Sequence, residues 1–308
     1  RVKYPCIKKQ FGIPVAPLNN LLYMINVYRV LNNIERPDII HVHGIGPVIF
    51  GSIIGKLMKI PVVGMLHGTT EAYSRMSGVF ESLLAKLFKP DHALILDSGT
   101  RAPEKFRKIW GDRVTIVYHG IDLASFYPKE KNKHILQKLN LKESDFIILS
   151  ISNLIPIKNI DLAIETFESV IADVTNPRMI LLIAGDGSQK EELVKLVDIK
   201  GLNDRVKFLG SITAEQIPDY ISIADVCIGM SLKDNMNRSV LEPMACGKAV
   251  VAFSGGSIEK LITTGYNGFL AKRGDVLDFA DKLKVICDNS ELRGAIGKNA
   301  RNTIISKR

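Results

Sequence analysis

The chain has 308 residues, of which 46% are hydrophobic and 24% are charged, and this composition excludes a disordered chain, a collagen, a coiled coil and a small disulfide scaffold. The length suffices for two domains. The formal net charge of +9 is uneven, because residues 1–120 carry 16 Lys and Arg against 8 Asp and Glu, whereas residues 121–308 carry 25 against 24. The basic first part suits nucleic acid, an anionic membrane surface or a phosphorylated substrate, and solubility alone is the competing explanation.

In the first part of the chain, apolar runs rich in β-branched residues alternate with helical patterns. Strands are predicted at residues 39–43, 61–66, 93–97 and 114–118. A helix rich in small residues is predicted after the first strand, and two further helices are predicted at 73–88 and 100–109. Strands that alternate with helices predict βαβ units and a parallel sheet.

The polar segment 125–145 interrupts this pattern and is predicted to be a hinge between a domain at 1–124 and a domain at 146–308. The alternation then resumes, with predicted strands at 146–152, 179–185, 206–209, 226–230, 249–253 and 268–270. The predicted helices of this part cover 160–174, 189–199, 214–223, 239–246, 257–263 and 276–288. The sequence therefore predicts an α/β protein of two Rossmann-like, doubly wound domains, in which ligands bind beyond the carboxyl ends of the strands. We expect the first domain to be incomplete, because no opening strand and glycine loop follow Arg1.

Two features limit the chemistry and the location of the chain. Its four cysteines, Cys6, Cys227, Cys246 and Cys287, lack C-x-x-C spacing and are predicted to be reduced packing residues. The apolar stretch 44–55 is about 12 residues long, whereas a membrane-spanning helix needs about 20. Membrane contact is therefore expected to be peripheral.

Histidines follow the first two predicted strands. His41 and His43 share one face of a strand end, and His67 ends the next strand. A histidine at the carboxyl end of a strand is well placed to contact a substrate hydroxyl, and a structural role is the alternative. No local Cys or acidic residue completes a zinc site, so no metal is predicted.

Two pairs of glycines are interpreted differently. The segment 51–57 resembles a phosphate-binding P-loop only superficially, since its glycine spacing is one residue short and Leu57 stands where a P-loop has the Ser or Thr that binds magnesium. Gly51 and Gly55 are therefore predicted to be glycines that let a helix pack closely. Gly185 and Gly187 follow a predicted strand and precede a helix, where free backbone N–H groups attract phosphate, although a simple turn fits equally well.

The strongest pattern lies between Met230 and Phe253. Asp234 follows a predicted strand, and Glu242 comes eight positions later, early in the next helix. The intervening backbone amides are able to hold a diphosphate while the carboxylates bind sugar hydroxyls. Each carboxylate alone is also explained by favourable charge at a helix start.

With the other blocks of the chain, this stretch resembles the Glu-x7-Glu region of family 4 retaining glycosyltransferases, the glycosyl transferases group 1, which have the GT-B fold of two Rossmann-like domains facing across a cleft. The supporting blocks occur in the family's order and are 41–44, 67–68, 118–122, 152–159, 184–187, 208–210, 255–259 and 265–268.

The resemblance implies a role for each matching residue. His67, Asp234 and Glu242 match catalytic positions, and His43 lies on the acceptor side. The donor-binding positions are Asn153, Lys158, Gly185, Gly210, Ile212, Asn235, Arg238, Ser239 and Val240. Asn153 stands where many members have Arg, so Lys158 and the loop amides must supply more of the phosphate binding.

The implied activity is retaining hexosyl transfer from a UDP- or GDP-sugar to a glycan, a lipid-linked acceptor or another hydroxyl, without a metal ion or other cofactor. The expected location is cytoplasmic, peripheral on the inner face of the membrane. A sugar-nucleotide 2-epimerase and a non-catalytic nucleotide-sugar-binding fragment remain as alternatives. Nucleic acid is not an expected partner, because the basic residues are not interleaved with an aromatic stripe.

Overall fold

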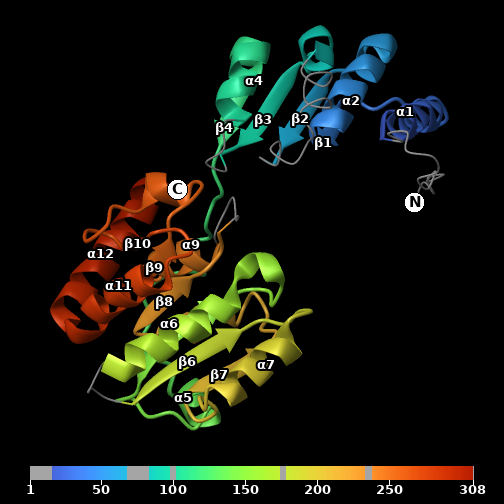
Figure 1. Cartoon of the computed structure of the whole chain (residues 1–308). Coiled ribbons are helices and arrows are strands. Elements are labelled where there is room, and N and C mark those ends of the chain that lie inside the picture. Colours follow the sequence, from blue (N-terminus) through green and yellow to red (C-terminus); the bar gives the residue numbers. More distant parts are fainter. Residues whose placement is uncertain (1–15, 68–82, 98–101, 174–177, 233–237, 308) are drawn as a thin grey trace. The chain divides into compact units, whose positions relative to one another are not determined.

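The computed structural model of the chain describes residues 16–67, 83–97, 102–173, 178–232 and 238–307. The chain divides into two compact units, Arg1–Tyr118 and His119–Arg308. Each contains one parallel sheet with helices packed against it (Figure 1), which confirms the predicted pair of α/β domains.

The sheet of unit 1 has four parallel strands in the order β1-β2-β3-β4. The strands are β1 (Ile40–His43), β2 (Val62–Leu66), β3 (His92–Leu96) and β4 (Val114–Val117). The described helices are α1 (Ala16–Asn32), α2 (Ile45–Met58), α4 (Ala102–Trp110) and the 3-10 turn η2 (Gly111–Arg113). Residues 83–87 are also helical, and residues 73–82 of the helix predicted at 73–88 lie outside the described residues.

Helix α2 packs closely on this sheet because of its two glycines. A Cβ on Gly51 would lie 3.0 Å from Cγ1 of Val42, and one on Gly55 would overlap Cγ2 of Val62. The structure therefore confirms both residues as packing glycines, and Lys56 follows them at the end of α2 rather than before a helix.

Unit 2 has six parallel strands in the order β10-β9-β8-β5-β6-β7. They are β5 (Phe146–Ile151), β6 (Met179–Ala184), β7 (Val206–Gly210), β8 (Val226–Gly229), β9 (Ala249–Phe253) and β10 (Phe269–Ala271). The main helices are α6 (Ile160–Asp173), α7 (Lys190–Ile199), α8 (Ile217–Ile223), α9 (Arg238–Ala245), α11 (Val276–Asp288) and α12 (Ser290–Lys307). Two short elements are η3 (Pro156–Lys158) and α10 (Ile258–Leu261).

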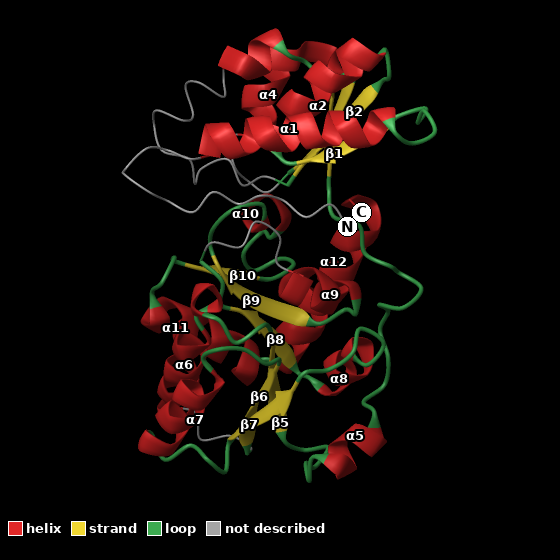
Figure 2. Cartoon of the chain, turned by 90° about the vertical axis from the view of Figure 1, so that its right-hand side faces the viewer, coloured by secondary structure: helices red, strands yellow, loops and turns green. Residues whose placement is uncertain are grey.

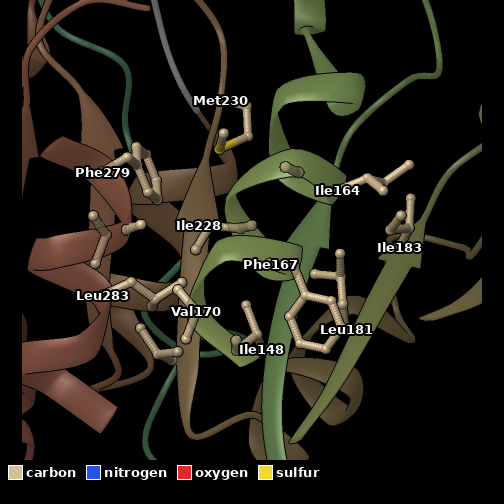
Figure 3. Close-up of a cluster of buried hydrophobic side chains, with 14 of the residues drawn as sticks. Ile148, Ile164, Phe167, Val170, Leu181, Ile183, Ile228, Met230, Phe279 and Leu283 are labelled. Carbon is tan, nitrogen blue, oxygen red and sulfur yellow. The ribbon is translucent and has the colours of Figure 1, made fainter. Parts of the chain in front are cut away.

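The four central strands of unit 2, β9, β8, β5 and β6, are buried on both faces, which explains why they are continuous apolar runs. All residues of β6 and β9 are buried. Alternate residues enter different clusters, so that Ile148 faces α6 and α11 (Figure 3) while Ile147 and Leu149 face the cluster that contains α8 and α9. Figure 2 shows helices on both sides of the strands, as a doubly wound sheet requires.

The segment 125–145, which the sequence predicted as a hinge, packs onto unit 2. It contains helix α5 (Lys133–Lys138), whose first turn is capped by the Asn132 side chain accepting from the Ile135 N–H at 3.2 Å. Ile135 and Leu136 are buried against the sheet, and Lys131 forms an ion pair with Asp225 at 2.9 Å. The lysines that make the segment look solvated therefore tie it to unit 2, and the boundary between units lies earlier, after Tyr118.

Helix α1 was not predicted, because its apolar residues do not form one clear stripe. In the part of the chain that the structure describes, none of the helices combines the length and apolar character needed to cross a membrane.

Candidate functional site

The strand order of unit 2 reverses between β8 and β5. From β5 the chain adds β6 and β7 on one side, and then returns to add β8, β9 and β10 on the other. In an open parallel sheet, a crevice forms at such a reversal beyond the carboxyl ends of the strands, and ligands bind there. The loop after β5 (residues 152–159) and the residues 230–232 that follow β8 border this point. The first loop contains the predicted donor-binding residues Asn153 and Lys158, and three more, Arg238, Ser239 and Val240, begin α9.

Hydrogen bonds join these two loops. The Asn159 side-chain amide donates to the Met230 carbonyl at 3.2 Å, and the Ser231 hydroxyl donates to the Ile157 carbonyl at 3.3 Å. Asn159 adopts a left-handed conformation, with φ of 49°, that ends η3 and starts α6. Lys158 precedes it and is half-buried, whereas Asn153 is exposed. The loop that carries Lys158 is therefore fixed directly beside the loop that follows β8.

Helix α9 carries an ion pair near its first described residue. The Arg238 Nε donates to Oε1 of Glu242 at 2.8 Å, and the Glu242 side chain is only 3% exposed whereas that of Arg238 is 66% exposed. Burial raises the pKa of the Glu242 carboxyl, and the Arg238 guanidinium partly opposes this shift. Because the Arg238 Nε donates to Glu242, the guanidinium has further N–H groups with which it is able to donate to an anionic ligand.

Four more predicted site residues lie on either side of Arg238 in the sequence. Asp234 and Asn235 lie outside the described residues. Ser239 is half-buried, and the Val240 side chain is buried in the core, so that any contact of Val240 with a ligand must come from its backbone.

The glycines after β6 have a structural reason to be glycine. A Cβ on Gly185, which has φ of 139°, would overlap the Ser152 carbonyl, and one on Gly187 would overlap that of Leu154. The Gly185 N–H donates to the Gly210 carbonyl at 2.8 Å, which joins the ends of β6 and β7. Ile212, just beyond Gly210, packs against the core. These contacts account for Gly185 without a ligand, and its phosphate-binding role stays a prediction.

Unit 1 brings histidines together at the carboxyl edge of its sheet. Nδ1 of His43 and Nε2 of His67 are 2.9 Å apart, and the two rings are stacked with centroids 5.2 Å apart. The His41 ring lies 4.5 Å from that of His43, as expected for residues two apart on one strand face. All three side chains are exposed. The pair is therefore able to relay or share a proton at the end of β2.

Sequence reasoning missed a carboxylate at the same edge. Asp97 directly follows β3 and is 3% exposed, and its backbone N–H donates to the Val117 carbonyl of β4 at 2.9 Å. The signal was an acidic residue at the end of an otherwise apolar strand, since charged groups are rarely buried without a purpose.

Within the described ranges, no group of three or more His, Cys, Asp or Glu side chains is arranged to hold a metal ion.

Two glycosyltransferase family models match consecutive parts of the chain. The model described as "Glycosyl transferases group 1" matches residues 131–303, and the model described as "Glycosyltransferase Family 4" matches residues 4–125. The chain is 25% identical to N-acetyl-alpha-D-glucosaminyl L-malate synthase of Bacillus anthracis, over 88% of this chain and 70% of that protein. It is 25% identical to UDP-Gal:alpha-D-GlcNAc-diphosphoundecaprenol alpha-1,3-galactosyltransferase of Escherichia coli, over 95% of this chain and 76% of that protein. Among solved structures, HepE of Anabaena in complex with UDP matches with a TM-score of 0.78 and 22% identity, over 94% of this chain and 79% of that chain.

Proposed function

The chain belongs to the glycosyl transferases group 1 and is a glycosyltransferase of GT-B fold, and on this premise we propose that it transfers a hexose from a UDP-sugar to a lipid-linked hydroxyl acceptor with retention of configuration. The observation that carries the proposal is the strand reversal of unit 2, where the loop with Lys158 is hydrogen-bonded to Met230 and Ser231, just after β8.

UDP is the proposed nucleotide because solved structures of HepE hold UDP and UDP-glucose, and because the Escherichia coli relative is named for UDP-Gal. The lipid-linked acceptor is suggested by the diphosphoundecaprenol in the same name and by the basic character of unit 1. An anionic membrane surface is then a second partner, held by long-range attraction.

In the proposed reaction, the bond between the sugar C1 and the donor phosphate breaks while the acceptor oxygen bonds to C1 on the same face. The departing phosphate oxygen takes the acceptor proton. The main electrostatic task is to stabilise the negative charge that grows on the diphosphate. Lys158, the Arg238 guanidinium and the backbone N–H groups at the start of α9 would perform it.

The other residues would orient the reacting groups. Asp234 would bind the sugar hydroxyls and Glu242 the ribose end of the donor, both as acceptors of hydrogen bonds. His67, held by His43, would contact the acceptor hydroxyl. The mechanism assigns no step to a metal ion or other cofactor.

Calorimetric titration with UDP-, GDP- and other nucleotide sugars tests the donor. We expect Lys158→Gln to weaken UDP binding about tenfold, since a hydrogen bond to a charged group contributes about 1.5–3 kcal/mol. Lys195→Gln removes an exposed charge on α7 and serves as the matched control. Unchanged UDP affinity in Lys158→Gln would contradict the assigned role.

The product identifies the reaction. Proton NMR of the first product formed gives its anomeric configuration, and an inverted product would contradict the proposed retention. A product that keeps its nucleotide would instead indicate an epimerase, and UDP binding without turnover would indicate a binding protein.

A further inference from the structure

Unit 1 contains a cationic cavity at the edge of its sheet opposite to the histidines. The cavity has a volume of about 600 Å³. Ile60 and Pro61 line it just before β2, Asp91 just before β3 and Arg113 just before β4, so it lies at the amino ends of the strands. His43 and His67 lie at the carboxyl ends, and β2 alone separates the two edges by roughly 13 Å at about 3.3 Å per residue.

The lining has five cationic side chains and one carboxylate. The cations are Lys56, Lys59, Lys86, Lys89 and Arg113. They come from the ends of three segments, α2, the helical residues 83–87 and η2, because in a βαβ fold each helix returns to the amino edge of the sheet. Basic residues at a helix end complement the helix dipole, but that explains each side chain separately and not their convergence on one cavity.

Local contacts leave the cavity positive. The carbonyl groups of Met58 and Lys59, which end α2, both accept hydrogen bonds from the Arg36 guanidinium at 3.0 Å, so the negative end of this helix is compensated. Oδ2 of Asp91 accepts from the Val62 N–H at 2.8 Å and so is directed to the backbone. Arg113 donates one N–H to the Pro90 carbonyl at 2.9 Å, which fixes its guanidinium at the rim.

The composition of the cavity differs from that of an apolar ligand pocket, which is lined mainly by hydrophobic side chains with a few polar groups. Several cations around one concave space favour a ligand with concentrated negative charge, and phosphate groups are the anions that Lys and Arg bind best. Leu57 and Leu87 are 70% and 63% exposed beside Lys56 and Lys86, so apolar side chains flank the cations.

We propose that this cavity is a phosphate-binding site separate from the donor site. Its ligand carries one or more phosphate groups, which a free phosphate ester or the head group of an anionic lipid would supply. The proposal does not depend on the donor chemistry, because every residue of the cavity lies outside the residues assigned to that chemistry.

The test uses the full chain with two probes, pyrophosphate in calorimetry and phosphatidylglycerol vesicles in co-sedimentation, with phosphatidylcholine vesicles as the neutral reference. The variant is Lys56→Gln with Lys89→Gln. The matched control is Lys195→Gln with Lys298→Gln, which removes the same charge from exposed positions of unit 2.

For whichever probe binds the wild type, we expect the affinity of the cavity variant to fall roughly thirtyfold, since each basic residue near an anionic surface contributes about a factor of five. The affinity of the control variant should change little. Binding of pyrophosphate identifies a soluble ester site, and binding of anionic vesicles alone identifies a lipid head-group site. Either of these two binding results, lost in the cavity variant and kept in the control, supports the proposal.

Asp91→Asn tests the same site in the opposite direction. It removes the single negative charge of the lining while an amide oxygen still accepts from the Val62 N–H, so it should tighten binding severalfold. UDP affinity should be unchanged in all these variants. Failure of both probes to bind, or an equal loss in the control, would overturn the proposal.

Discussion

The buried carboxylate of Glu242 leads to a prediction in which stability and activity move in opposite directions. The side chain is 3% exposed, and burial raises its pKa, so its ionised form costs free energy in the folded state. Glu242→Gln removes the charge, keeps the size and keeps an oxygen that accepts from the Arg238 Nε. We expect this variant to unfold at a higher temperature at neutral pH and to lose transfer activity.

The size of the gain follows from the geometry of the ion pair. Glu242→Gln removes only one charge of the pair, which is destabilising where the remaining charge is left buried and unpaired. Here Arg238 is 66% exposed and remains hydrated, and its contact with Glu242 at 2.8 Å offsets part of the desolvation cost. We therefore expect a gain of about 1 kcal/mol, or about 2–4 °C in Tm for a unit of this size.

The sign of the pH dependence is fixed by the raised pKa. The carboxyl binds its proton more tightly in the folded chain, so the cost of ionisation is fully present above the folded pKa and absent below the unfolded pKa. The difference in Tm between Glu242→Gln and the wild type should consequently grow as the pH rises from about 4 to 8.

Differential scanning calorimetry across this pH range measures the effect. Glu130→Gln makes the same chemical change at an exposed position and should shift stability by less than about 0.5 kcal/mol. A Glu242→Gln variant that is less stable at pH 8, or whose difference from wild type does not vary with pH, would refute the desolvation argument. Full transfer activity would refute only the donor-binding role.

Three further predictions concern packing and burial. Gly294→Ala on α12 should stabilise the folded protein by about 1 kcal/mol because the added Cβ meets open space. Gly297→Ala on the same helix should destabilise the folded protein because the added Cβ would overlap the Gly247 carbonyl, and thermal unfolding compares the two variants. Phe167→Ala should cost about 3–5 kcal/mol in urea unfolding, since Phe167 is 1% exposed at the centre of a core cluster (Figure 3). Burial raises the pKa of Cys246 and Cys287 to about 12, so at pH 8 both thiols should react with a disulfide reagent far more slowly in the folded than in the urea-unfolded protein.

The strands and most helices were predictable because a parallel sheet imposes a simple pattern on the sequence. Buried strands such as β6 and β9 are uninterrupted apolar runs, and amphipathic helices separate them. The helix α5 escaped prediction because Lys129, Lys131 and Lys133 dominate its surroundings. Only the structure shows that Lys129 and Lys131 pair with Asp219 and Asp225, about 90 residues away.

The residues of the candidate site were named from motif order and their roles stay predictions, whereas their arrangement comes from the structure. The positions of Lys158 and Glu242 follow from motif order, whereas the reversal between β8 and β5 depends on strand order, which local patterns do not encode. The contact of Arg238 with Glu242 was accessible in principle, because residues four apart meet on one helix face. The separation of Asp91 from Val62 by 29 positions shows why the amino-edge cavity was not accessible.

Two independent physical arguments lead to the start of α9. Topology places it at the strand reversal, where a parallel sheet opens a binding crevice. Burial raises the pKa of the Glu242 carboxyl there, so its charge is expected to reduce stability, and local departures from the most stable choice are concentrated at functional sites. Neither argument uses the family resemblance. Because the two arguments would fail for different reasons, a Glu242→Gln variant that gains stability and loses transfer activity is the strictest test of the assigned site.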